Sequence, residues 1–132
     1  MNASSLKLHR KYKGIIPEIA SRAHIECISL VVEQALKKAG KKINDIDLVC
    51  VTKGPGLIGS LLVGISFARG LSYALKKPLI GVDHLEAHLY ASFLSAEPAM
   101  PFIGLVVSGG HTSLFLVKNG FTFKTLGATV DD

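Results

Sequence analysis

Two histidines that stand four residues apart, His84 and His88, form the clearest group that could do chemistry. In a helix this spacing puts both on one face with Cβ atoms ~5–6 Å apart, so both imidazoles can reach one metal ion, at ~2.0–2.1 Å for zinc. An apolar segment ends at Val82, just before the pair, and α/β proteins bind ligands where strands end. The positive end of a helix dipole favours neutral imidazole, the form that binds metal. The spacing predicts a two-histidine metal site, and the sequence identifies no third ligand.

The two acids beside these histidines are better explained as helix caps than as catalytic groups. Asp83 stands at the expected start of the helix and Glu86 three residues later, which is the spacing of a capping box. Zinc proteases of the H-E-x-x-H and H-x-x-E-H types need a glutamate directly beside one histidine. Glu86 is beside neither, which excludes that protease chemistry. The ordinary alternative for the pair is two half-buried polar residues on an exposed helix face.

A glycine turn after an apolar run is the second candidate for a ligand site. Its residues are, in order, Val106, Val107, Ser108, Gly109, Gly110, His111 and Thr112. Consecutive glycine N–H groups can form an anion-binding concavity, to which Ser108 and Thr112 add hydroxyl donors and His111 a third donor. The structural alternative is a hairpin turn that needs glycine for positive φ. No Ser–His–acid triad is predicted, because no residue is evident that would orient His111.

A third segment, Gly54–Gly59, matches the G-x-G-x-x-G pattern of dinucleotide-binding Rossmann proteins. It follows an apolar strand and precedes a helix, and Asp83 stands near the spacing of the ribose-binding acid. However, Pro55 removes one N–H from any phosphate cradle, and the segment lacks the lysine of a P-loop. The alternative is a glycine-rich turn that lets the helix pack closely on the sheet.

The elements that must position these groups follow from the hydrophobic periodicity and its interruptions. Pro17 suits the first turn of a helix and Gly40 stops it. The expected helices cover Pro17–Ala39, Leu57–Leu75 and Asp83–Leu94, and the expected strands cover Leu48–Thr52, Leu79–Val82, Phe102–Val107, Thr112–Val117 and Phe121–Leu126. Asn119-Gly120 is a two-residue hairpin signal. The order of strands and helices, followed by a meander, predicts an α/β fold, with Cys50 as a small core residue.

Composition narrows the class of protein. The chain has 132 residues, 48% of them hydrophobic, and a net charge of +5, which excludes a disordered protein and fits one domain or part of one. Two cysteines and no signal-like N-terminus exclude a secreted disulfide scaffold. The charge-free stretch Gly54–Ala68 is shorter than the ~18–20 residues that cross a bilayer, so we expect a cytoplasmic protein without a membrane partner. The basic charge favours a polyanionic partner such as nucleic acid.

Taken together, four segments resemble the tRNA N(6)-threonylcarbamoyladenosine transferase family, in its bacterial form. The matching segments, in register over nearly the whole chain, are Gly14–Glu26, Thr52–Gly64, Gly81–Ala91 and Val107–Thr112. The resemblance implies an actin/Hsp70/sugar-kinase-like (ASKHA) fold. The family's first strand and C-terminal half have no counterpart here, so we expect residues 1–132 to be one partial domain, truncated at both ends and belonging to the N-terminal α/β half.

The resemblance also implies a reaction and a site. The family transfers threonylcarbamoyl from threonylcarbamoyl-AMP to N6 of the adenosine beside the anticodon. His84 and His88 would ligate an iron or zinc ion that holds the adenylate phosphate. The residues expected to contact the substrate are Val106, Val107, Ser108, Gly109, Gly110 and, less directly, His111. The implied partners are tRNA, a shorter paralogous subunit that binds through helices, and a small ATPase.

Three functions follow as competing expectations. The first is a fragment of the transferase, inactive by itself because the third metal ligand, an aspartate in this family, belongs to the C-terminal half. The second is a piece of a Rossmann-type oxidoreductase, which would use Gly54–Gly59 and Asp83 but leaves both histidines unexplained. The third is the non-catalytic paralogous partner, which is expected to lack the metal pair.

Overall fold

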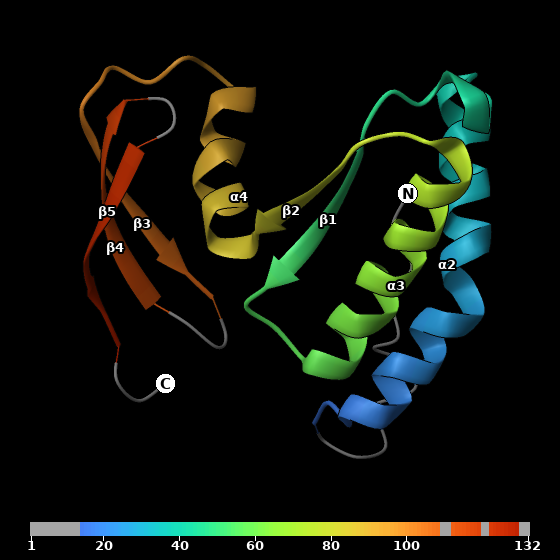
Figure 1. Cartoon of the computed structure of the whole chain (residues 1–132). Helices are drawn as coiled ribbons and strands as arrows, with labels where there is room; N and C mark the ends of the chain where they lie inside the picture. The colour runs from blue at the N-terminus through green and yellow to red at the C-terminus, as the bar shows by residue number, and fades with distance from the viewer. Residues whose placement is uncertain (1–13, 109–111, 120–121, 130–132) are drawn as a thin grey trace. The chain divides into compact units, whose positions relative to one another are not determined.

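The computed structural model describes residues 14–108, 112–119 and 122–129. The chain divides into two compact units, Met1–Asp83 and His84–Asp132. The first combines two helices with parallel strands, and the second combines a short helix with an antiparallel meander (Figure 1). The predicted α/β class is confirmed.

Helix α2, Pro17–Ala39, has the predicted bounds. Pro17 occupies the first turn, where its missing N–H breaks no hydrogen bond, and Glu18 lies at the positive end of the helix dipole. Gly40 ends the helix in the left-handed conformation, with φ 63°. There the N–H of Gly40 donates to the carbonyl of Lys37 at 3.1 Å, and the N–H of Lys41 donates to that of Leu36 at 3.0 Å. These two bonds satisfy carbonyls that the helix end would leave unpaired.

The rest of the first unit is built from two parallel strands and a second long helix. After the short 3₁₀ helix η2, Ile43–Asp45, strand β1 runs over Val49–Gly54 and pairs in parallel with β2, Leu79–Asp83. Helix α3, Ile58–Leu75, connects them. It is long and apolar enough to cross a membrane by length and composition alone. It contacts α2 and β1, although Ala68 is its one buried residue.

The expectation that Cys50 is a core residue is wrong. Its side chain is exposed, and Val49 is the one buried residue of β1. Successive strand residues point to opposite faces of a sheet, and α3 covers the face of Val51, whose Cγ2 lies 3.6 Å from the place a Cβ on Gly64 would take. Cys50 projects to the other face.

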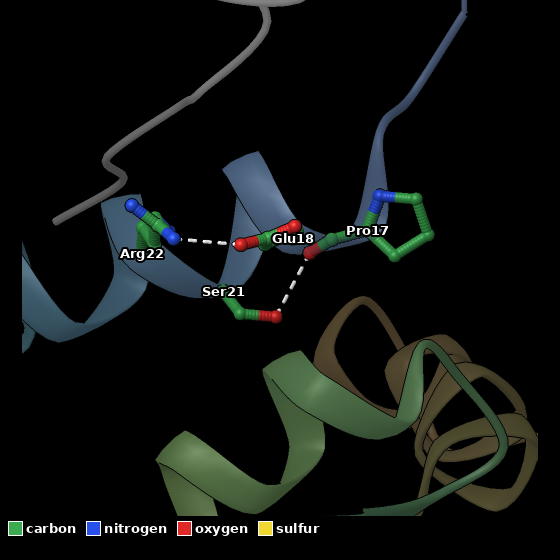
Figure 2. A network of polar contacts seen from close by, with 4 residues as sticks. All are labelled: Pro17, Glu18, Ser21 and Arg22. Atoms are coloured by element: carbon green, nitrogen blue, oxygen red, sulfur yellow. Dashed lines mark hydrogen bonds and ion pairs between the residues drawn. The ribbon is translucent and has the colours of Figure 1, made fainter.

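The helices α2 and α3 touch closely near their first turns. A Cβ on Gly59 of α3 would overlap the hydroxyl of Ser21 on α2. Figure 2 shows that this hydroxyl donates to the carbonyl of Pro17, at 2.8 Å, while Arg22 and Glu18 form an exposed ion pair at 2.7 Å. Gly59 therefore allows an approach that a larger residue would obstruct.

The second unit begins with helix α4, His84–Tyr90, which continues as the 3₁₀ helix η3, Ala91–Leu94. The predicted helix Asp83–Leu94 is therefore shorter at both ends, since Asp83 completes β2. Strands β3 (Phe102–Val107), β4 (Thr112–Asn119) and β5 (Thr122–Ala128) form an antiparallel sheet in that order. The predicted turn residues Gly109, Gly110 and Gly120 lie outside the described residues.

One face of this sheet packs against α4. The core of the unit consists of Leu89 from α4 with Val106, Phe115 and Val117, flanked by Leu85, Phe102 and Phe123. Because strand residues alternate between faces, the intervening residues form a second face, which is also apolar. This outer face exposes the side chains of Ile103, Leu105, Val107 and Leu114.

Candidate metal and substrate site

The two predicted metal ligands meet as the helical spacing requires. His84 opens α4 and His88 follows one turn later. Their Nε2 atoms lie 3.2 Å apart, with ring centroids 4.5 Å apart and planes inclined by 69°. Both side chains are exposed, so both nitrogens are open to an incoming ion. Without a metal, the same distance is a hydrogen bond in which one ring donates to the other.

The separation of the two nitrogens fits a pair of metal ligands. Two nitrogens at ~2.0–2.1 Å from one ion, with a tetrahedral angle between them, lie ~3.3–3.4 Å apart. The observed 3.2 Å is close to this value. Imidazole suits both zinc and iron. In the described part of the chain, no third His, Cys, Asp or Glu gathers with this pair.

A groove of about 520 Å³ lies beside the second histidine. Residues from α4, the loop before β3, and β3 line it: His88, Leu89, Ser92, Pro98, Ala99, Phe102, Ile103, Gly104, Leu105, Val106 and Val107. It therefore joins one predicted metal ligand to two residues predicted to contact the substrate, Val106 and Val107. Val106 is buried in the core and fixes the strand, whereas Val107 is 68% exposed.

The remaining predicted substrate residues are only partly covered by the structure. Ser108 follows β3 directly and is exposed. Gly109, Gly110 and His111 lie outside the described residues. Thr112 begins β4 and pairs with Val107 of β3. The two strands predicted before and after residues 109–111 are therefore both present and are paired with each other.

Gly104 is a site-positioning residue that the sequence reasoning missed. It lies in the middle of β3, and a Cβ placed there would overlap Cδ2 of Leu89. Leu89 is 7% exposed and belongs to the core of the unit. The missing side chain thus lets α4, with both histidines, lie directly on β3. An isolated glycine within an apolar strand is a known signal of such close approach, and it could have been used here.

The loop Gly54–Gly59 has a structural explanation for its glycines. Gly54 and Gly56 have φ of 148° and 156°, values that L-residues with a side chain rarely adopt. Gly59 leaves room for the Ser21 hydroxyl where α2 and α3 touch. The predicted packing role therefore accounts for the pattern without a bound dinucleotide.

Comparison with protein families gives a match over the whole chain. The family model described as TsaD, tRNA N6-adenosine threonylcarbamoyltransferase, matches residues 1–132. Among curated proteins, the tRNA N6-adenosine threonylcarbamoyltransferase of Thermodesulfovibrio yellowstonii is 56% identical over 131 residues, which are 98% of this chain and 39% of that protein. The protein of the same name from Dictyoglomus turgidum is 52% identical over 131 residues, with the same coverage. The chain thus spans well under half the length of these relatives.

Solved structures support the fold. YeaZ from Pseudomonas aeruginosa superposes with a TM-score of 0.57 at 20% identity, covering 83% of this chain and 53% of that one. The similarity is to a partial ASKHA-type α/β fold. The 52–56% identity to these proteins also places the chain among them by sequence. The chain belongs to the TsaD family of tRNA N6-adenosine threonylcarbamoyltransferases.

Proposed function

We propose that this chain supplies the metal-holding part of an enzyme that transfers threonylcarbamoyl from threonylcarbamoyl-AMP to N6 of the adenosine beside the tRNA anticodon. The observation that carries the proposal is the family match over residues 1–132. Because the relatives are much longer than the chain, the proposal treats it as part of the N-terminal α/β half of the catalytic fold. The substrate, tRNA, is consistent with a cytoplasmic location.

His84 and His88 would hold the metal, an iron or zinc ion, through their Nε2 atoms. The support is the 3.2 Å between these atoms and the exposure of both rings. A bound divalent cation stabilises negative charge on a phosphate. Since both ligands are on α4, the contact of Leu89 with Gly104 sets their position relative to β3.

The chain's own residues are proposed to bind and orient the adenylate rather than attack it. Val106, Val107 and Ser108 lead to the turn, and Gly109 and Gly110 would donate backbone N–H groups to the phosphate, with His111 beside them. A mixed anhydride is already activated, so the reaction needs no protein nucleophile, and holding the reactants in line supplies much of the acceleration. This agrees with the absence of a triad in the sequence.

The metal site is tested by metal content. We expect one iron or zinc per chain after anaerobic loading, measured by native mass spectrometry, and loss of that metal in His84→Ala/His88→Ala. His24→Ala is the matched control, because His24 lies on α2 and its Nδ1 contacts the carbonyl of Ala20. Equal metal content in the double variant and the control would exclude the pair as ligands.

The transfer reaction is tested in a chimera. This chain replaces the matching 131 residues of the Thermodesulfovibrio yellowstonii relative. Incorporation of labelled threonylcarbamoyl into a tRNA transcript is measured with the paralogous subunit and the small ATPase of that organism present. We expect transfer by the chimera, none by the 132-residue chain alone, and at least a hundredfold loss in the His84→Ala/His88→Ala chimera. A folded chimera that incorporates no label would refute the proposal.

The paralogous subunit is proposed to dock on the α2–α3 pair. A shallow apolar groove of about 460 Å³ lies between these helices, lined by Ile25, Ile28, Ser29, Leu62, Val63, Ser66 and Phe67. Ile25 and Leu62 are 62% and 55% exposed, which leaves them available to a partner helix. Leu62→Asp should abolish co-purification with the paralogue, whereas Leu30→Asp, outside the groove, should not. The small ATPase is proposed from the resemblance alone.

A further inference from the structure

Six lysines gather at one end of the first unit. Ser21, near the start of α2, meets Gly59, near the start of α3, and residues close to both C-termini, Ala39 and Leu71, line one groove. The two helices therefore run in the same direction and end side by side (Figure 1). The lysines in and just after their last turns, here called the lysine cluster, are Lys37, Lys38, Lys41, Lys42, Lys76 and Lys77.

The cluster is exposed and carries an excess of positive charge. Lys77 forms an ion pair with Asp47 at 3.4 Å, and its side chain is 33% exposed. The carboxylate of Asp45 accepts the backbone N–H of Lys42 at 2.8 Å. Within the described ranges, the other five lysines are exposed and form no ion pair. Their charge is therefore free to act on a partner.

Lys76 stands where helix geometry favours glycine. It ends α3 with φ 52° and ψ 41°, while Gly40 ends α2 with φ 63° and ψ 28°. The capping bonds also correspond, since the N–H of Lys76 donates to Tyr73 at 3.3 Å and that of Lys77 donates to Ser72 at 3.1 Å. A left-handed conformation strains a residue that has a Cβ, and glycine avoids that strain. Strained residues of this kind concentrate at functional sites.

Favourable interaction with the helix dipole explains only part of the cluster. Lysines in the last turn of a helix stabilise its negative end, and this accounts for Lys37 and Lys38 in α2. It does not account for Lys41 and Lys42, which follow the cap, or for a strained lysine at 76. These three residues add charge where the helix does not require it.

We infer that the lysine cluster binds the phosphate backbone of RNA. This inference rests on the proposed function, for which it names a contact surface for the tRNA substrate. Lysine presents a compact point charge that suits phosphate without reading bases. Tyr73, in the last turn of α3, is 88% exposed and could add a base-stacking contact beside these charges.

The test is the affinity of the 132-residue chain for a fluorescein-labelled tRNA transcript, measured by anisotropy between 50 and 200 mM KCl. Each phosphate contact adds ~0.7 to the slope with which the logarithm of the binding constant falls against the logarithm of the salt concentration. At 0.1 M salt, one such contact corresponds to about a fivefold gain in affinity. Lys41→Gln/Lys76→Gly should therefore weaken binding ~25-fold and lower the slope by ~1.4. The control Lys118→Gln/Lys124→Gln removes the same charge from β4 and β5 and should leave the affinity unchanged.

Lys76→Gly alone separates binding from folding. It should lower affinity about fivefold, while the thermal midpoint stays the same or rises, since glycine relieves the strain at this cap. Equal losses in both double variants would show that net charge alone governs binding and would overturn the inference. So would binding to phosphatidylserine vesicles with none to the transcript. The binding assay needs neither metal nor adenylate. Its result therefore does not depend on whether the chimera catalyses the transfer reaction.

Discussion

Replacing Gly104 by alanine should destabilise the second unit through a single contact. The new Cβ would overlap Cδ2 of Leu89, and Leu89 is held on its other sides by Val106, Phe115 and Val117. Any relief of the overlap must displace the Leu89 side chain from this core, the strand, or α4. Overpacking of this kind costs ~1–3 kcal/mol. Alanine offsets ~0.5–1 kcal/mol of this cost, because it loses less backbone freedom on folding than glycine does. We expect a net loss of about 1–2 kcal/mol.

Gly127→Ala is the matched control. Gly127 lies in β5 of the same sheet, and a Cβ there would meet nothing within 4 Å. Urea unfolding followed by circular dichroism gives the free energies, and hydrogen exchange at the β3 and β4 amides assigns any loss to the second unit. The control should change stability by less than ~0.5 kcal/mol. Equal effects at Gly104 and Gly127 would refute the contact argument.

A double variant tests the cause directly. Leu89→Ala alone should cost ~2–5 kcal/mol, because it leaves a cavity. In that background Gly104→Ala should cost nothing or stabilise, a coupling of ~1–3 kcal/mol. Gly104→Ala should affect metal binding and adenylate binding differently. Both histidines lie on α4, so Gly104→Ala moves them together and preserves metal binding, while it shifts His88 relative to Val107 and weakens binding of the adenylate in the chimera.

Three further outcomes follow from the first unit. Gly59→Ala should change stability by less than ~1 kcal/mol, because the Ser21 side chain can rotate away and lose only its hydrogen bond. In a Ser21→Ala background the same substitution should stabilise the protein by ~0.5–1 kcal/mol. A double-mutant cycle in urea measures both values. Gly56→Ala should cost ~1–3 kcal/mol by the same assay, since its φ of 156° is strained for alanine. Glu18→Gln should cost less than ~1 kcal/mol, because its ion pair is 73–74% exposed, and the cost should shrink further in 0.5 M salt; an undiminished cost would contradict this.

The features that were predicted best from the sequence are those that depend on residues close together along the chain. The bounds of α2 follow from Pro17 and Gly40, which start and stop a helix without help from distant residues. The bounds of β3 were also predicted, and the histidine pair needs only helical periodicity. Features that depend on tertiary neighbours were missed. The side on which Cys50 projects depends on which face α3 covers. The groove beside His88 depends on the close approach of β3 and α4 at Gly104.

The three-stranded sheet has a consequence for how this polypeptide behaves in solution. Its outer face is apolar and exposed, and β3 and β5 each have an unpaired edge in the described structure. Strand β3 is a six-residue, uncharged segment of high β-propensity, the composition that templates intermolecular strand addition and cross-β aggregation. Between residues 102 and 129 the charged side chains are Lys118 and Lys124, so few charges lie along this sheet. In the described structure this meander is therefore open to self-association, and burial of its outer face against another polypeptide would remove that exposure.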